Sequence, residues 1–252
     1  MNEQILQKMK QLKFFGMAAA FRASLEGGRL ATLTADETVS MLIDSEWDDR
    51  NNRRVERNLR NARFRYNACI EQVHYDTERN LDRNQIMRLA ECTFIGKAEN
   101  ILITGSTGIG KSYLASALGN QACTLGYKVY YSNANKLFAK LKMTKADGSY
   151  IREIARIEKQ DLLIIDDFGI QALDNHNRSA LMEIIEDRHG KRSTIITSQI
   201  PVSEWYDVIG EKTLADAILD RLVHDAHRIE MKGESLRRRN SNMNQKKLVI
   251  TD

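Results

Sequence analysis

The chain has 252 residues, a formal net charge of +4 and 29% charged residues, which suits one α/β core with a smaller appended module. No apolar run approaches the roughly 20 residues that a membrane-spanning helix needs, so we expect no membrane partner. The N-terminal stretch is amphipathic and of mixed charge, unlike a secretory signal. Cys69, Cys92 and Cys123 lack the spacing of a metal site or a disulfide framework, and they predict reduced thiols in the cytoplasm.

Residues 1–67 predict a small all-helical N-terminal domain. Apolar residues recur at helical spacing between Ile5 and Leu12, and two adjacent glycines, Gly27 and Gly28, interrupt the pattern. The sequence Thr34–Glu37 has the form of a capping box and predicts a new helix that begins there. Residues 68–97 are interpreted as a connecting segment.

From residue 98 the pattern changes to short apolar runs of strand length separated by helical segments. This alternation is typical of a parallel sheet flanked by helices on both faces, and it defines an α/β domain over residues 98–239. Residues 240–252 are interpreted as a mobile basic tail without an assigned function. The five predicted strands are Ile101–Thr104, Val129–Ser132, Leu162–Asp166, Ser193–Thr197 and Arg228–Met231.

The strongest motif is a phosphate-binding loop of the form G-x4-G-K-[ST], which identifies a P-loop NTPase. An apolar strand leads into the motif and a helical run leads out, so backbone N–H groups should converge on the phosphates of ATP. Lys111 would place its charge at the β- and γ-phosphates, and the Ser112 hydroxyl would ligate Mg²⁺. The predicted cofactor-binding residues are Gly105, Ser106, Thr107, Gly108, Ile109, Gly110, Lys111, Ser112 and Tyr113.

Two acids close the apolar run Leu162–Asp167, which has the form of a Walker B strand. Asp166 would hold Mg²⁺ through water, and Asp167 would polarise the attacking water as a general base. The strand Ser193–Thr197 also ends in polar residues, and Ser198 or Thr197 is the candidate for contact with the γ-phosphate. Gln199 remains an alternative for this sensing role.

Arg221 and Arg237 are candidate cationic donors to the transition state of ATP hydrolysis. Spacing does not decide whether either arginine acts on the nucleotide of its own chain or on that of a neighbour. The alternative for Arg221 is a surface arginine paired with Asp220, and the alternative for Arg237 is a member of a basic tail. The choice among Arg237, Arg238 and Arg239 also stays open.

Seven arginines lie between Arg50 and Arg65, against the single acid Glu56. A helical projection places four of them opposite an apolar stripe, and we expect these arginines to face solvent or a polyanion without acid partners on their own helix. A solvated helix face is the alternative. Clustered arginine favours a phosphate-rich partner, and low sequence specificity would follow from backbone contacts. The hypothetical duplex-DNA contacts are Arg50, Arg53, Arg54, Arg57, Arg60, Lys140, Lys145 and Arg152.

Together these motifs resemble the IstB/DnaC group of AAA+ ATPases over most of the chain, and the IstB-like proteins of insertion sequences within it. The resemblance is carried by Ser45–Arg50, Asn80–Arg83, Leu89–Cys92, Glu99–Gly105, Leu163–Gly169, Thr197–Pro201, Trp205 and Asp220–Leu222. It implies an AAA+ fold with ATP at the interfaces of a homo-oligomer. It further implies that Arg221 is a finger that reaches a neighbour's ATP and that Arg237 contacts the γ-phosphate within its own chain.

The resemblance also implies a function in the bacterial cytoplasm, at the nucleoid when the protein is on DNA. Such a protein would assemble on double-stranded DNA and recruit an IstA-like transposase. Asp167 departs from the usual glutamate and is one methylene shorter, so we expect slow ATP hydrolysis that DNA or transposase stimulates. Two alternatives remain: a DnaC-like helicase loader that acts with single-stranded DNA, and a non-catalytic module gated by ATP.

Overall fold

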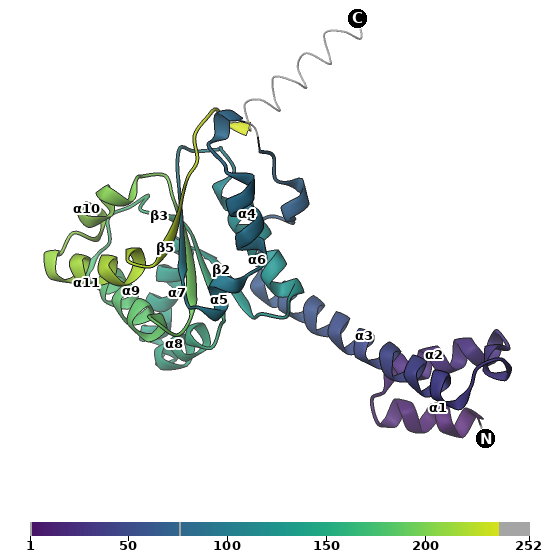
Figure 1. The fold of residues 1–252 in the computed structure, drawn as a ribbon. Coiled ribbons are helices and arrows are strands. Elements are labelled where there is room, and N and C mark those ends of the chain that lie inside the picture. Colours follow the sequence, from purple (N-terminus) through teal and green to yellow (C-terminus); the bar gives the residue numbers. More distant parts are fainter. Residues whose placement is uncertain (1, 76, 237–252) are drawn as a thin grey trace, which may run out of the picture. The chain divides into compact units, whose positions relative to one another are not determined.

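The computed structural model describes residues 2–75 and 77–236, and its contacts divide the chain into two units, Met1–Arg57 and Asn58–Asp252. The division falls inside the long helix α3 (Ala35–Ala62), whereas the sequence placed a boundary after residue 67. Figure 1 shows the fold. The predicted tail at 240–252 lies outside the described residues, and so does Arg237 with its two neighbours. None of the helices described is long and apolar enough to cross a membrane.

The first unit contains α1 (Asn2–Gln11), α2 (Phe15–Glu26), the 3-10 turn η1 (Arg29–Ala31) and the first part of α3. The predicted capping box begins α3: the Thr34 backbone N–H donates to the Glu37 carboxylate over 2.8 Å, and the Glu37 N–H donates to the Thr34 hydroxyl over 3.3 Å. The buried Glu46 carboxylate accepts the Gly16 N–H over 2.8 Å and so satisfies the start of α2. A β-carbon on Gly16 would lie 2.2 Å from the Ser45 carbonyl oxygen, so the close approach of α2 to α3 requires glycine.

The second unit is built on a five-stranded parallel sheet with the strand order β2-β3-β4-β1-β5. The sheet confirms the predicted α/β class, and all five predicted strands are present. Because every strand runs in the same direction, their carboxyl ends meet at one edge of the sheet. The strands are β1 (Asn100–Thr104), β2 (Val129–Asn133), β3 (Leu162–Phe168), β4 (Ser193–Ser198) and β5 (Ala226–Glu230).

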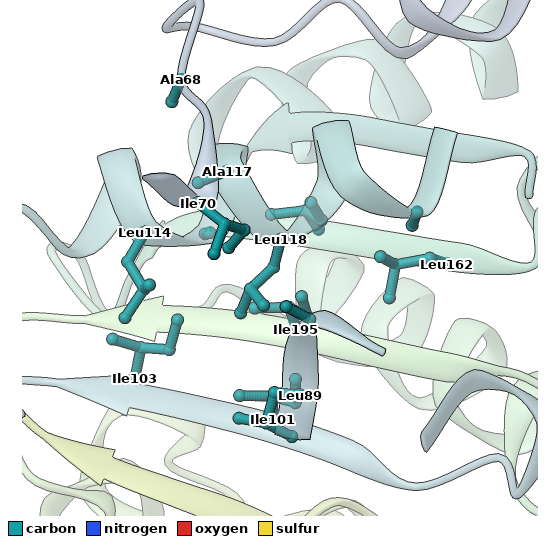
Figure 2. Close-up of a cluster of buried hydrophobic side chains, with 14 of the residues drawn as sticks. Ala68, Ile70, Leu89, Ile101, Ile103, Leu114, Ala117, Leu118, Leu162 and Ile195 are labelled. Atoms are coloured by element: carbon teal, nitrogen blue, oxygen red, sulfur yellow. The ribbon is translucent and has the colours of Figure 1, made fainter. Parts of the chain in front are cut away.

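Side chains alternate between the two faces of this sheet, and each face has its own apolar core. On β1, Ile101 and Ile103 pack into one core while Leu102 packs into the other. Figure 2 shows the first core, where Leu114 and Leu118 of α6 lie over strand residues. Helix α6 (Lys111–Thr124) shares that face with α4 (Arg83–Ala90), α5 (Thr93–Gly96) and the turn η2 (Ile70–Gln72). A further turn, η3 (Thr77–Arg79), lies between η2 and α4 in the chain.

The opposite face of the sheet is covered by helices that follow β2, β3 and β4 in the chain (Figure 1). Trp205 is fully buried in this core, with its ring 4.9 Å from that of Phe168 at the end of β3. Helices therefore cover both faces of the sheet, so a binding site is expected at the edge where the carboxyl ends of the strands meet. The covering elements are α7 (Ala134–Ala146), α8 (Tyr150–Glu158), α9 (Asn175–Arg188), η4 (Val202–Glu204), α10 (Trp205–Ile209) and α11 (Lys212–Val223).

The segment 68–97, interpreted from sequence as a connection, contributes to the first core of the second unit. Ala68, Ile86 and Cys92 have no exposed surface, and Ile70 lies beneath α6 in Figure 2. Burial raises the pKa of the Cys92 thiol to about 12, so this cysteine stays protonated and acts as a small apolar side chain. The segment is thus part of the core of the second unit as well as a connection.

Candidate functional site

The phosphate-binding loop lies between the end of β1 and the start of α6, as the motif predicted. Gly105 and Gly108 have positive φ angles of 140° and 83°. A β-carbon on Gly105 would lie 2.2 Å from the Met231 carbonyl oxygen, and one on Gly108 would lie 2.2 Å from the Ser235 hydroxyl. Both glycines are therefore required by backbone conformation and by the chain segment that follows β5.

Lys111 curls back onto its own loop. Its ammonium group donates to the carbonyl oxygens of Gly105 and Ser106 over 2.7 and 2.8 Å. Burial lowers the pKa of Lys111, and the nearby carboxylates of Asp167 and Asp166 oppose that shift. The loop therefore holds a buried cation at the helix N-terminus, which is an arrangement that suits a phosphate chain.

A cavity of about 380 Å³ opens at this loop. Two strand ends supply its polar wall, with Asp167 in the last residues of β3 and Gln199 directly after β4. Six of the nine predicted cofactor-binding residues line it, whereas Ile109 is buried in the core beneath the loop. The lining residues are Arg65, Tyr66, Thr107, Gly108, Gly110, Lys111, Ser112, Tyr113, Asp167, Gln199 and Leu236.

A second, more apolar cavity of about 440 Å³ shares Gly110, Tyr113 and Leu236 with the first. The segment 72–81 supplies its other wall, to which the sequence analysis assigned no role in binding. Arg79 braces this wall against the loop, because its guanidinium donates to the His74 carbonyl over 2.7 Å and to the Ile109 carbonyl over 2.5 Å. The remaining lining residues are Gln72, Val73, His74, Arg79, Leu81 and Leu114.

The two acids of the Walker B strand sit in a β-bulge. Ile165 pairs with Ile196 and Phe168 pairs with Ser198, so Asp166 and Asp167 together oppose the single residue Thr197. The bulge turns the two carboxylates to different surroundings. Asp166 is fully buried, and Asp167 faces the nucleotide cavity.

The Asp166 carboxylate accepts hydrogen bonds from two hydroxyl groups. The Thr197 hydroxyl donates to one carboxylate oxygen over 2.5 Å, and the Tyr131 hydroxyl donates to the other. Burial, and then the hydrogen bond to Asp166, raise the pKa of Tyr131, so its proton stays in place. Asp166 is thereby held in one orientation by neighbouring strands on both sides.

Asp167 has a left-handed backbone with a φ of 59°, which aspartate tolerates better than most residues. Its carboxylate accepts from Arg65 over 3.0 Å and from the Asn133 amide over 3.1 Å. The same Arg65 nitrogen lies 3.6 Å from Asp166. The sequence analysis counted Arg65 within the arginine-rich segment and did not assign it to this site, because 102 positions separate it from Asp167.

The structure does not bring Ser198, one predicted sensing residue, into the cavity. Ser198 is fully buried, and its hydroxyl donates to the Phe168 carbonyl over 2.8 Å. The alternation of strand side chains explains the difference, because the following residue points the other way. Gln199 lines the cavity and accepts a hydrogen bond from Thr107 of the loop over 2.7 Å.

Arg221 lies on α11 and does not line the nucleotide cavity of its own chain. Its guanidinium is 2.7 Å from the Glu186 carboxylate and donates to the Ala217 carbonyl over 2.9 Å. Arg221 therefore pairs with Glu186 of α9, and not with Asp220 as the alternative interpretation expected. The Arg221 Nε is buried and has no hydrogen-bond partner among the described residues.

The expectation that the arginines of α3 lack acid partners on their own helix is wrong for two of them. Arg50 binds Glu46 over 2.6 Å, and Arg53 forms an ion pair with Asp49. Both acids precede Arg50, and each lies four positions before its own arginine, at the i,i+4 spacing that favours such pairs. Arg50 and Arg53 also lie over the rings of Phe14 and Phe15, at 5.5 and 4.9 Å.

The remaining predicted DNA contacts have mixed surroundings. Arg54 donates to Asn51 over 2.8 Å, whereas Arg57 and Arg60 are exposed and form no ion pair with any described residue. Lys140 binds Glu153 over 2.6 Å, Lys145 lies 4.6 Å from the Tyr150 ring centre, and Arg152 is exposed.

In the part of the chain that the structure describes, no group of three or more histidine, cysteine, aspartate or glutamate residues could hold a metal ion. The predicted metal ligands, Ser112 and Asp166, are oxygen donors, which suit Mg²⁺. Because both Asp166 oxygens already accept hydroxyl groups, a contact through water fits this carboxylate better than direct ligation. The residues present therefore fit a magnesium ion carried by nucleotide phosphates.

Comparisons with known proteins agree with this geometry. The chain is 45% identical over 233 residues to an insertion sequence ATP-binding protein of Sinorhizobium fredii, covering 92% of this chain and 95% of the relative. The fold is similar to that of the DnaC helicase loader, with 21% identity, a TM-score of 0.54 and coverage of 66% of this chain and 98% of the loader. AMPPCP-bound DnaA from Aquifex aeolicus shares 19% identity with a TM-score of 0.58, covering 68% of this chain and 52% of DnaA.

These structures, both below one quarter identity, support the AAA+ fold alone. The family described as IstB-like ATP binding protein matches residues 7–244, which is most of the chain. The nucleotide cavity, the parallel sheet and this match lead to one conclusion: the chain belongs to the IstB-like ATP-binding protein family.

Proposed function

We propose that this protein is an ATPase that assembles on duplex target DNA and recruits a transposase for insertion-sequence transposition. The observation that carries the proposal is the meeting of Lys111, Ser112 and Asp167 in one cavity, in a chain of the IstB-like family. The reaction is the hydrolysis of ATP by water to ADP and phosphate.

The cavity residues divide the chemistry among them. Loop N–H groups and Lys111 bind the phosphates, and Asp167 orients and polarises the attacking water. Ser112, with Asp166 acting through water, would hold Mg²⁺, which neutralises charge on the phosphates when bound. Gln199, already hydrogen-bonded to the loop, takes the place of Ser198 as the group nearest the γ-phosphate.

The apolar cavity beside the loop suits the adenine base. It shares Gly110 and Tyr113 with the phosphate cavity, and its wall contains Val73 and Leu81. A flat, apolar base would pack against this wall while backbone groups of the segment supply polar contacts. The sugar would then lie near Tyr113, where the two cavities meet.

The second half of the proposal concerns DNA and the partner protein. Arg57 and Arg60 of α3 form no ion pair with any described residue, and no hydrogen bond to Asn51 holds them as it holds Arg54, so they are the first choice for duplex phosphate contacts. Such contacts carry no sequence code, which fits target choice with low specificity. We place the assembly in the bacterial cytoplasm at the nucleoid, as a homo-oligomer in which Arg221 leaves Glu186 to reach a neighbour's ATP.

Sedimentation of an Asp167→Asn variant with ATP tests this proposal, because the variant should bind nucleotide without hydrolysing it. We expect large complexes on duplex DNA that disappear when ADP replaces ATP. Complexes on single-stranded DNA alone, or none without a replicative helicase, would contradict the proposal and favour a helicase loader. Absence of turnover by the wild-type chain, compared with a Lys111→Ala blank, would instead indicate a non-catalytic module.

A further inference from the structure

A third cavity, of about 640 Å³, lies beside the nucleotide cavity at the edge strand β2. It shares Arg65 and Asp167 with the nucleotide cavity. Four basic residues line it (Arg63, Arg65, Lys136 and Lys140) against the single acid Asp167. A concave surface with this excess of positive charge favours an anionic ligand.

The chain is built to hold Arg63 and Arg65 at this cavity. Between them, Phe64 packs edge-on against the Tyr131 ring, with the ring centres 6.1 Å apart. A β-carbon on Gly119 of α6 would lie 2.5 Å from the Phe64 ring, so only glycine leaves room for this anchor. Arg63 itself has a left-handed backbone, with a φ of 58°. The partly buried Phe64 ring thus anchors the backbone between the two exposed arginines.

Two of the four cations are uncompensated. Arg63 and Lys136 are exposed and form no ion pair with any described residue. Lys140 is bound to Glu153 over 2.6 Å, and Arg65 is bound to Asp167 over 3.0 Å. The positive end of the α7 dipole adds to this field, because the helix begins at the cavity residue Asn133, its N-cap.

We propose that this cavity binds a backbone phosphate of DNA and that the phosphate competes with Asp167 for Arg65. The inference rests on the proposed function, since it requires a chain that binds duplex DNA and hydrolyses ATP. A sugar–phosphate segment suits the cavity better than a small anion, because about 640 Å³ exceeds the space that one phosphate occupies. Arginine, lysine and a helix N-terminus are the groups that hold DNA phosphates.

The consequence is a link between DNA and hydrolysis. Without DNA, Arg65 and Asn133 both donate to one oxygen, Oδ2, of the Asp167 carboxylate, which is the group that must polarise the attacking water. A phosphate beside Arg63 and Lys136 draws Arg65 away, which removes the ion pair from Asp167 and makes its carboxylate a stronger acceptor for the attacking water. DNA then stimulates turnover through one shared side chain, and Arg65 acts as a positioning residue.

Steady-state ATP hydrolysis by the full chain, with and without random-sequence duplex DNA, tests the link. We expect DNA to stimulate the wild-type chain several-fold. Arg65→Gln should hydrolyse ATP several-fold faster than the wild type when DNA is absent, and DNA should then add little. Arg65→Lys, which keeps the charge, should recover part of the response to DNA. Retained DNA stimulation in Arg65→Gln, or no stimulation of the wild type, would overturn the inference.

DNA affinity as a function of salt tests the cavity itself. The Arg63→Gln/Lys136→Gln variant should lower the slope of log affinity against log salt by about 0.9 for each lost phosphate contact. It leaves Arg65 in place, so the cavity stays testable even if Arg65→Gln fails to fold. The matched control is Lys159→Gln/Lys191→Gln, which removes two exposed cations that precede β3 and β4, at the amino end of the sheet.

The outcomes separate this inference from the function on which it rests. A wild-type chain that does not bind duplex DNA would overturn both. DNA binding with equal salt slopes in the cavity variant and the control would overturn the cavity assignment alone. Inorganic phosphate that stimulates hydrolysis as strongly as DNA would identify a free-anion site and overturn the assignment to DNA.

Discussion

The nucleotide cavity and the arginine-rich part of α3 both gather basic side chains, but they hold them differently. In the cavity, Lys111 is buried and Arg65 is paired with a carboxylate 102 positions away. On α3, Arg50 and Arg53 pair with acids one helical turn away, and Arg57 stays exposed. Whether a basic side chain is available to bind a ligand therefore depends on which carboxylates lie next to it in the folded chain.

The largest effect is expected from Arg221→Ala. If Arg221 completes a neighbour's site, its loss should lower turnover by about 10³–10⁵-fold and leave ATP binding nearly unchanged. Hydrolysis and binding of a fluorescent ATP analogue measure the two effects. Glu186→Gln is the matched control, because it removes the same ion pair and keeps the arginine.

Mixing two inactive variants sharpens this prediction. Chains with Arg221→Ala and chains with Lys111→Ala should regain hydrolysis when mixed, because an intact loop can then meet an intact neighbouring arginine. No recovery, or equal losses in Arg221→Ala and Glu186→Gln, would show that Arg221 serves its own chain.

Gly119→Ala tests the anchor on which the cavity depends. The new methyl group would meet the Phe64 ring at 2.5 Å and the Ile164 side chain at 2.7 Å, and such overpacking costs about 1–3 kcal/mol in unfolding free energy. Denaturant unfolding measures the loss. A variant as stable as the wild type would show that Phe64 moves freely. The double change Phe64→Leu/Gly119→Ala should recover stability, since it makes room for the methyl group.

Glu46→Gln tests the local pairing on α3. Burial raises the pKa of Glu46, but hydrogen bonds from Arg50, Met17 and Gly16 outweigh it and leave the pKa below its usual value. A lowered pKa means that the folded state prefers the carboxylate, so this stability is present above the unfolded pKa and is lost as pH falls through the folded one. Loss of a hydrogen-bonded charge should cost about 1–2 kcal/mol at neutral pH.

Unfolding of the wild type and the Glu46→Gln variant as a function of pH measures this effect. The difference between them should shrink below the ordinary glutamate pKa. A difference that persists in acid would mean that packing, and not charge, accounts for the loss.

The smallest expected effect is a difference in the salt dependence of DNA binding between two pairs of arginines on α3. Arg57→Gln/Arg60→Gln should lower the salt slope of DNA binding by about 0.9 per lost contact. Arg50→Gln/Arg53→Gln should lower it less, because these arginines are already paired with Glu46 and Asp49. Equal slopes for both variants and the wild type would show that this face does not contact DNA.

Motifs carried by neighbouring residues could be predicted from the sequence. The loop at Gly105–Ser112, the acids after the third strand's apolar run and the capping box at Thr34 each depend on contacts within a few positions. The pairing of Arg50 and Arg53 is equally local, but both acids precede Arg50 and so lie outside the segment Arg50–Arg65 on which the prediction rested. The buried hydroxyl of Ser198 was missed because strand alternation turns neighbouring side chains to opposite sides.

The fold class, the phosphate-binding loop and the pair of acids can be predicted from the amino-acid sequence, because they follow from local pattern and backbone geometry. The surroundings of each charge depend on the folded chain. It placed Arg65 on Asp167, two hydroxyls on Asp166 and Glu186 on Arg221. These contacts join segments that are distant in the chain, and packing against the sheet, rather than any repeat in the sequence, brings them together.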